Sequence, residues 1–164
     1  MRCSHGKCKR KTRVVPYCWQ HAELLLKVKI RKCSWLPDGN KSLFAFSKAK
    51  LTTGPLFRKG QKVLRYEGEL LTEDEISERY DYYVNGELIE GPAEYTLEYA
   101  DGKFVDAIII RGYSAFINDP KGYIKHPDGL SPNVVFRKNR WIFALRDIYN
   151  GEEILIDYGE NYFA

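Results

Sequence analysis

The sequence predicts a mainly β domain with one short helix and a small metal-binding segment at the N-terminus. Most of the chain after residue 40 consists of short β-like runs broken by Gly, Pro, Asn and Asp. Only one segment carries a strong helix-initiation signal, and alternating strand–helix units of the Rossmann type are not visible. Three cysteines and a histidine near the start have the spacing of a zinc site.

Length and composition limit the classes of protein to which the chain can belong. A chain of 164 residues fits one domain with a small appendage, and 44% hydrophobic residues suit a packed core, not a disordered chain. No apolar stretch approaches the roughly 18 residues of a membrane span, so we expect no membrane contact. The basic start lacks the apolar part of a secretory signal, which predicts an intracellular, reducing setting without disulfides.

The predicted elements follow one another along the chain. Residues 22–29 (AELLLKVK) favour a short helix that leads into a strand. The later β-like runs are SLFAF (42–46), QKVLRYEG (61–68), KFVDAIII (103–110), PNVVFR (132–137), RWIFALRDI (140–148) and EEILIDYG (152–159).

One helix and two turns interrupt these runs. Thr72 followed by Glu75 forms a capping box, which predicts a helix over residues 73–82. The pair Asn85-Gly86 predicts a tight turn, and Asp101-Gly102 predicts a β-hairpin. The helix and both turns lie in one acidic part of the chain.

Charge is unevenly distributed although the net charge is only +4. Residues 1–66 hold 17 Lys and Arg against two acidic residues, a net charge of +15. Residues 67–106 hold 13 Asp and Glu against two basic residues, a net charge of −11, and form an acidic insert. The basic part suits nucleic acid and the acidic insert suits a cationic peptide. Two solvated faces that neutralise each other in the fold would explain the same pattern.

The N-terminal segment, residues 1–26, has the ligand spacing C-x4-C-x9-C-x2-H, formed by Cys3, Cys8, Cys18 and His21. Three thiolates and one imidazole suit structural Zn²⁺, and metal binding would supply the folding free energy of a segment with little apolar content. His5 is an alternative ligand, Cys33 reads as a buried thiol, and free thiols in a flexible tail are the competing interpretation. The segment either docks on the β domain or presents its basic run, residues 7–13, to phosphates.

Ordered blocks in the rest of the chain resemble the SET-domain protein lysine methyltransferases. They cover about residues 40–162 and are SLFAF (42–46), KGQKVLRYEGELLTEDE (59–75), FVDA (104–107), FIND (116–119), PNVVF (132–136) and FALRDIYNGEEILIDYGENYF (143–163). Each block alone is a weak signal, whereas the set in this order is specific. The resemblance is to a minimal form of the family, with an N-terminal zinc segment and no cysteine cluster after the DYG block.

The resemblance implies a SET-domain (β-clip) fold over residues 27–164, with a C-terminal pseudoknot. Residues 116–119 would lie beside residues 154–158. It also implies that S-adenosylmethionine and a substrate lysine enter from opposite faces and meet in a narrow aromatic channel. Such a channel suits methyl transfer because desolvation beside a sulfonium cation disfavours the ammonium form of the lysine.

Individual residues match the functional positions of the family. Tyr158 matches the catalytic tyrosine that positions the amine, Tyr162 belongs near the lysine channel, and Tyr95 is a further channel aromatic. Asn118 matches the cofactor-binding asparagine. The other residues expected at the cofactor are Gly39, Asn40, Lys41, Ser42, Phe116, Asp119, Tyr158 and Phe163.

The chain departs from the family pattern at three places. Asp119 stands where the family has histidine, but this residue contacts the adenine mainly through its backbone, so aspartate can substitute. Residues 38–42 (DGNKS) replace the GxG cofactor loop, with Lys41 near the carboxylate of the methionine moiety. No cysteine follows Cys33, so residues 161–164 would close the lysine channel without the zinc-binding segment of many relatives.

The resemblance therefore predicts an S-adenosylmethionine-dependent protein lysine N-methyltransferase that acts on histone tails, in the nucleus or on chromatin. The acidic insert lies where the family shapes its peptide groove, and its charge would attract a basic tail. Two other functions fit part of the sequence. One is a SET-like module with weak or no catalysis that binds histone or nucleic acid, and the other is a zinc-dependent nucleic-acid binder that uses the basic N-terminal region.

Overall fold

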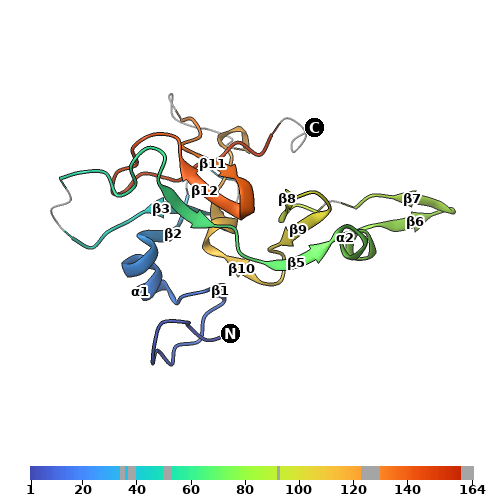
Figure 1. Ribbon diagram of the computed structural model, residues 1–164, viewed down its shortest axis with the longest axis horizontal. Coiled ribbons are helices and arrows are strands. Elements are labelled where there is room, and N and C mark those ends of the chain that lie inside the picture. The colour runs from blue at the N-terminus through green and yellow to red at the C-terminus, as the bar shows by residue number, and fades with distance from the viewer. Residues whose placement is uncertain (34–35, 37–39, 50–52, 92, 123–129, 160–164) are drawn as a thin grey trace.

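The computed structural model describes residues 1–33, 36, 40–49, 53–91, 93–122 and 130–159 (Figure 1). The fold is mainly β, as the sequence predicts, and its short strands pair into several small sheets. The described strands are β1 (Val14–Val15), β2 (Val28–Lys32), β3 (Lys41–Ala45), β4 (Lys62–Arg65), β5 (Glu69–Thr72), β6 (Tyr82–Val84), β7 (Glu87–Ile89), β8 (Thr96–Ala100), β9 (Lys103–Asp106), β10 (Arg111–Gly112), β11 (Val134–Arg137) and β12 (Trp141–Ala144).

Helical segments are short. They are α1 (Trp19–His21), a π-helix (Ala22–Leu26), α2 (Glu73–Tyr80) and the 3₁₀ helices Tyr113–Phe116, Pro120–Gly122 and Lys138–Arg140. None of the described helices has the length and apolar character that crossing a membrane requires.

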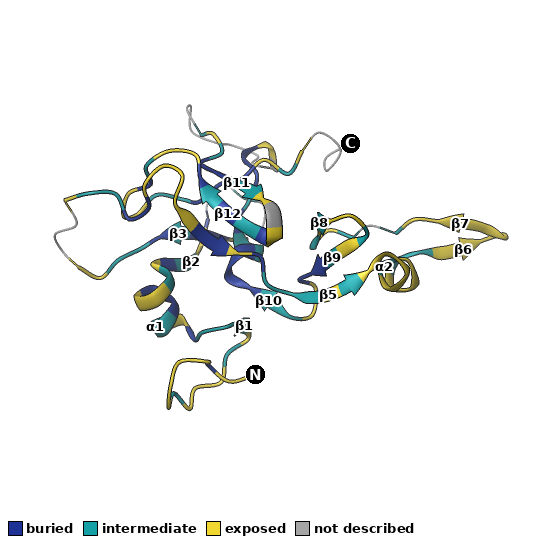
Figure 2. Cartoon of the chain, viewed as in Figure 1, coloured by how far each residue is buried: buried dark blue, intermediate teal, exposed yellow. Residues whose placement is uncertain are grey.

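The main core lies between the β2–β3 pair and the antiparallel sheet of order β11–β12–β4. Its largest fully buried aliphatic side chains include Leu43 of β3, Ile142 of β12, and Ile148 and Ile154 of the C-terminal segment. Full burial of each such side chain stabilises the fold by about 1.5–3 kcal/mol. Figure 2 shows these buried elements gathered in one part of the molecule, while α2, β6 and β7 are exposed.

The acidic insert forms a second, smaller unit. Its sheet has the order β5–β9–β8, and the hairpin between β8 and β9 turns at Asp101-Gly102, as predicted. The capping box of Thr72 and Glu75 is present, and α2 ends at Tyr80, two residues before the predicted end, because Asp81 takes an extended conformation. The predicted Asn85-Gly86 turn joins β6 to β7, with positive φ at both residues, as a type I′ turn requires.

The predicted strand over residues 152–159 is wrong as a continuous strand. Glu153 bridges to Phe44, and Leu155 bridges to Asn118, so the segment pairs with two different parts of the chain. The predicted strand over residues 103–110 ends at Asp106, because the Asp106 carboxylate accepts the main-chain N–H of Ile108 at 2.9 Å and turns the chain.

Candidate active site and metal centre

Two segments far apart in the sequence meet where the resemblance implies. Asn118 and Leu155 form a parallel bridge, and the main-chain N–H of Ile156 donates to the Asn118 carbonyl at 3.0 Å. The segment 154–156 is fully buried, so the contact lies inside the core. This arrangement brings Tyr158 next to the segment 116–119.

Tyr158 is held by hydrogen bonds at both its side chain and its main chain. Its hydroxyl donates to the Ile117 carbonyl at 2.6 Å. Its main-chain N–H donates to Oδ2 of Asp119 at 2.7 Å. The phenol is therefore fixed in position and orientation beside Asn118.

Asp119 uses its side chain to join the two segments. The residue is only 2% exposed, and its second carboxylate oxygen accepts the main-chain N–H of Lys121 at 2.8 Å. A buried carboxylate is costly unless hydrogen bonds satisfy it, and two main-chain donors do so here. The aspartate at the family's histidine position therefore has a structural role that the sequence did not reveal.

A cavity of about 880 Å³ opens at this junction. That volume lies in the usual range for cofactor and substrate sites. Of the residues predicted for the site, those that line the cavity are Asn40, Lys41, Tyr95, Phe116, Asn118, Asp119 and Tyr158. The Asn118 side-chain amide donates to the Lys41 carbonyl at 3.1 Å, which ties the replaced cofactor loop to the asparagine.

Of the described residues predicted for the site, one does not line the cavity. Ser42 is fully buried, and its hydroxyl donates to the Glu153 carboxylate, so the hydroxyl is used within the fold. Gly39, Tyr162 and Phe163 lie outside the described residues.

The structure adds residues that sequence reasoning missed. The Arg111 guanidinium lies 4.3 Å from the ring centroid of Tyr95, and Tyr66 donates its hydroxyl to the Tyr95 carbonyl at 3.1 Å. Both Arg111 and Tyr66 line the cavity. Tyr66 stands inside the RYEGE part of a recognised block, which was the available signal, whereas no sequence signal marks Arg111.

The predicted zinc ligands converge at the N-terminus. Their ligand atoms all lie within 4.8 Å of one another in the group Cys3, Cys8, Cys18 and His21. His21 Nδ1 is 3.2 Å from Cys3 Sγ and 3.5 Å from Cys18 Sγ. Tetrahedral Zn²⁺ with bonds of 2.0–2.3 Å would set its ligand atoms about 3.5 Å apart, so the set fits zinc. His5, the alternative ligand, packs on the His21 ring with centroids 4.2 Å apart.

The protonation of His21 agrees with metal binding. Desolvation, together with the charges of His5 and Arg10, lowers the pKa of the imidazole below its ordinary value. The ring is therefore neutral near pH 7, which is the form that binds metal.

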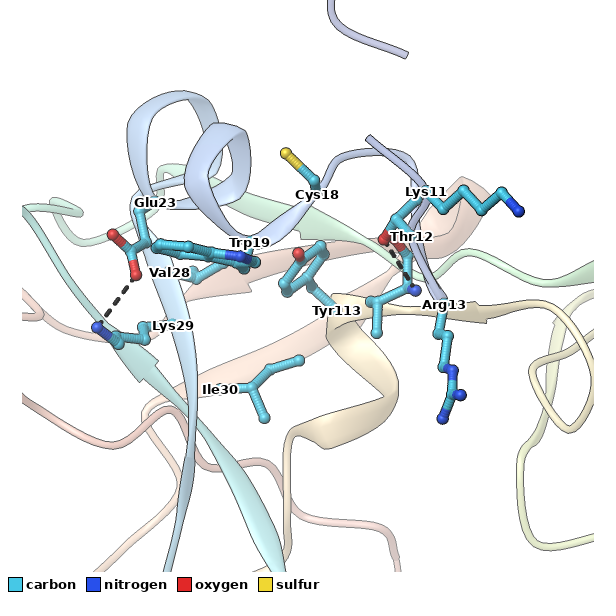
Figure 3. A pocket seen from close by; sticks show the side chains of 11 residues that line it. Lys11, Thr12, Arg13, Cys18, Trp19, Glu23, Val28, Lys29, Ile30 and Tyr113 are labelled. Atoms are coloured by element: carbon cyan, nitrogen blue, oxygen red, sulfur yellow. Dashed lines mark hydrogen bonds and ion pairs between the residues drawn. The ribbon is translucent and has the colours of Figure 1, made fainter. Parts of the chain in front are cut away.

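The N-terminal segment, residues 1–26, docks on the β domain. Its strand β1 pairs in parallel with β10, and the Tyr113 hydroxyl donates to the Tyr17 carbonyl at 3.0 Å. Figure 3 shows the Tyr113 ring between this segment and β2. Residues of both line a second cavity, with a volume of about 380 Å³. Burial raises the pKa of the Tyr113 phenol, so it remains a donor. Arg13 and Val14 of the segment also line the larger cavity.

The family model described as "SET domain" matches residues 50–159, which is more than half of the chain. The chain belongs to the SET-domain family. The resemblance drawn from the ordered blocks is thus confirmed, and so is the mainly β fold class.

Two curated relatives are similar to this SET-domain chain. Histone-lysine N-methyltransferase EZH2 of Chaetomium thermophilum is 30% identical over 111 residues, which cover 63% of this chain and 7% of the relative. Histone-lysine N-methyltransferase Su(var)3-9 of Drosophila melanogaster is 34% identical over 110 residues, which cover 62% of this chain and 16% of the relative.

Two solved structures are also similar to this chain. The crystal structure of the Chaetomium thermophilum polycomb repressive complex 2 is 27% identical, with a TM-score of 0.50, over 82% of this chain and 15% of that chain. The same complex in an autoinhibited conformation bound to S-adenosylmethionine is 25% identical, with a TM-score of 0.51. The match covers 82% of this chain and 15% of that chain. The chain therefore spans less than a fifth of the length of these relatives.

The site draws residues from inside the region that the family model matches and from the part of the chain before it. Tyr95, Asn118 and Tyr158 lie inside residues 50–159, whereas Asn40, Lys41 and the predicted zinc ligands precede them. The segments before residue 50 nevertheless form part of the same cavity wall.

Proposed function

We propose that this chain is an S-adenosylmethionine-dependent protein lysine N-methyltransferase that acts on histone tails. The observation that carries the proposal is Tyr158, with its hydroxyl bonded to the Ile117 carbonyl in a cavity that Asn118 also lines. Two similar proteins are named histone-lysine N-methyltransferases, and one similar structure is described as bound to S-adenosylmethionine. This activity would associate the protein with chromatin in the nucleus.

S-adenosylmethionine, when bound, supplies an electrophilic methyl group on a sulfonium. The chain's contribution is to hold and orient the reactants. Asn40, Lys41, Phe116 and Asn118 are the described residues that we assign to cofactor binding, with the Lys41 ammonium available to a carboxylate. The predicted contacts of Gly39 and Phe163 belong to the same proposal.

Tyr158 orients the lysine amine in this mechanism. Its hydroxyl donates to the Ile117 carbonyl at 2.6 Å, and a phenol oxygen can also act as an acceptor, so we assign it to accept an amine N–H of the substrate lysine. Tyr66, Tyr95 and Phe136 supply aromatic surface in the cavity, which excludes water and favours the neutral amine. Tyr162 is assigned to the lysine channel with them.

The chain divides by role in this proposal. Residues 1–26 bind zinc, residues 27–164 carry catalysis, and the acidic insert 67–106 faces a basic substrate. A cationic tail would meet the net charge of −11 on the insert before its lysine enters the cavity.

The decisive experiment is incubation of histones with the protein and S-adenosylmethionine, followed by mass spectrometry of methyl-lysine. We expect Tyr158→Phe to bind cofactor normally while its methylation rate falls by about 10²–10⁴-fold. Tyr149→Phe is the matched control, since Tyr149 is half-exposed and away from the cavity lining. Near-normal turnover in Tyr158→Phe would overturn the assigned role.

The alternative is a SET-like module with weak or no catalysis that binds histone. Calorimetric titration with S-adenosylmethionine separates the two functions. Absence of cofactor binding together with absence of methyl transfer would support the alternative.

We also propose that the basic N-terminal region contacts nucleic acid. The Arg31 guanidinium on β2 lies 5.7 Å and 5.2 Å from the ring centroids of Phe44 and Phe46, and the Lys29 ammonium lies 4.6 Å from Phe46. Cationic side chains that neighbouring rings hold in place suit contacts to the phosphates of duplex DNA.

We expect Arg31→Glu to weaken binding of duplex DNA in fluorescence anisotropy and to reduce the salt dependence of that binding. Loss of that binding in Cys18→Ser would indicate that zinc is required for it.

A further inference from the structure

The hairpin of β6 and β7 projects from the molecule with its apolar side chains uncovered (Figures 1 and 2). All six strand residues are exposed, and five of them are large and hydrophobic. Their exposed fractions are 52% for Tyr82, 73% for Tyr83, 46% for Val84, 55% for Leu88 and 36% for Ile89. We call these five side chains with Glu87 the arm. A grouped apolar surface of this kind marks an interaction site.

Both faces of the arm are apolar. In the register of the hairpin, Tyr82 pairs with Ile89, and Tyr83 pairs with Leu88. Because side chains alternate between faces along a strand, the first pair lies on one face and the second on the other. A two-stranded ribbon with no covered face is marginal by itself, so a partner that packs on it would also stabilise it.

The base of the arm is fixed to the catalytic part of the fold. At the end of α2, the Arg79 guanidinium bonds to the carboxylates of Asp106 and Glu69, each at 2.8 Å. Asp106 is fully buried, and it also accepts the Tyr80 hydroxyl at 2.7 Å. These bonds hold the end of α2, and with it the base of the arm, in one position.

The anchor also connects the arm to the cavity. Asp106 Oδ1 accepts the main-chain N–H of Ile108, and Ile108 with Ile109 lines the cavity of about 880 Å³. On the return side, Gly91 packs so closely on the Tyr80 carbonyl that a side chain would collide with it. A protein bound to the arm would therefore be held at a set position relative to the cavity mouth.

The charge around the arm selects the partner. Residues 73–90 contain seven Asp and Glu against one basic residue, Arg79, a net charge of −6. Arg79 is already paired with the carboxylates of Glu69 and Asp106, so it does not neutralise the acidic side chains around the arm. A partner that covers apolar side chains and meets this acidic surround must itself be basic.

We propose that the arm docks on the folded body of the basic substrate protein, while that protein's target lysine enters the cavity. The inference rests on the proposed methyltransferase function and extends it from the tail to the globular part of the substrate. The apolar side chains of the arm add affinity for the whole protein and none for a short tail peptide.

The test uses Tyr83→Ser combined with Leu88→Ser, which removes the apolar pair from one face. We expect kcat/KM for an intact histone to fall about tenfold through KM, while kcat/KM for a short peptide with the target lysine stays within about twofold. The matched control is Leu145→Ser combined with Tyr149→Ser, a second exposed leucine–tyrosine pair outside the arm. Equal loss on both substrates, or loss on neither, overturns the inference.

A binding measurement keeps this test separate from catalysis. Biolayer interferometry with immobilised, unmodified histone should show about tenfold weaker binding for the double variant than for the native chain, and no change for the control. If the native chain methylates neither substrate but the variant still loses binding, the proposed function fails while the docking surface stands. If the double variant binds histone as tightly as the native chain, the arm is not a docking surface and the inference is wrong.

Two further outcomes are decided by light scattering and by a charge variant. If the native chain is a dimer and the double variant a monomer, the arm is a self-association surface and the inference is wrong. If the double variant does not fold, Glu87→Lys on the exposed arm replaces it. Its kcat/KM for intact histone should then fall by clearly more than its kcat/KM for the peptide, and equal losses overturn the inference.

Discussion

The buried carboxylate of Asp119 accepts the main-chain N–H of Tyr158 at 2.7 Å. Asp119 follows Asn118 directly, so one short segment supplies both the residue assigned to the cofactor and the support of the tyrosine assigned to the lysine. Its second oxygen holds the Lys121 main chain at 2.8 Å. Asp119, which departs from the histidine of the family pattern, thus connects the segment 116–119 to the segment 154–158.

The first prediction concerns this connection. In Asp119→Asn, the amide can accept only one of the two main-chain donors well, because its NH2 group faces the other. We expect a loss of about 1–3 kcal/mol in the free energy of unfolding, since a buried donor is left without its acceptor. We also expect methyl transfer to slow. Urea unfolding and initial rates would measure the two effects, with Asp101→Asn in the exposed hairpin turn as control. Unchanged stability would contradict the role given to the carboxylate.

A second prediction concerns the metal. We expect about one zinc per chain by elemental analysis, and loss of zinc in Cys18→Ser because one ligand of a tetrahedral site is missing. Since Arg13 and Val14 line the large cavity, loss of zinc should also weaken S-adenosylmethionine binding. Cys33→Ser is the control, because Cys33 is a buried cysteine outside the ligand group. Retention of zinc by Cys18→Ser would rule out the assigned ligand set.

The parts of the fold predicted from the sequence are those that local chemistry determines. They are the capping box of Thr72 and Glu75, the Asn85-Gly86 turn, and the convergence of Cys3, Cys8, Cys18 and His21. Each depends on residues close together in the chain. β6 and β7 were not predicted, although the turn between them was, because three-residue strands leave almost no periodic signal.

What escaped prediction depends on contacts across the fold. The position of Arg111 over Tyr95 follows from how β10 passes the β5–β9–β8 sheet, and no local pattern encodes it. The same holds for Arg13, which reaches the cavity only because β1 pairs with β10. The same holds for the Ser42 hydroxyl, which bonds to the distant Glu153 carboxylate.

A third prediction concerns the pH dependence of α2. The main-chain N–H and hydroxyl of Thr72 and the nearby Arg79 lower the pKa of Glu75 below its ordinary 4.5. A carboxylate with a depressed pKa in the folded state stabilises the fold above its unfolded pKa, and this contribution is lost as the pH falls through the folded pKa. Glu75→Gln should therefore destabilise the chain at about pH 7 and have a smaller effect at about pH 3.

Urea unfolding of the native chain and of Glu75→Gln at both pH values would measure this. Thr72→Ala serves as the comparison, because it removes the cap itself and should cost about 1 kcal/mol in the free energy of unfolding. An equal effect of Glu75→Gln at both pH values would show that the charge of Glu75 makes no contribution.

The last prediction tests whether docking of the zinc-binding segment shapes the cavity. Tyr113→Phe deletes the hydroxyl that donates to the Tyr17 carbonyl. The Thr12 hydroxyl still donates to that carbonyl at 3.3 Å, so we expect a loss of about 0.5–1.5 kcal/mol in the free energy of unfolding. The zinc ligands are untouched, so the metal should stay bound. Because Tyr113 begins the 3₁₀ helix that leads to Asn118, we expect weaker S-adenosylmethionine binding by calorimetry. Tyr149→Phe is the control. Full cofactor affinity in Tyr113→Phe would mean that the segment docks without influencing the site.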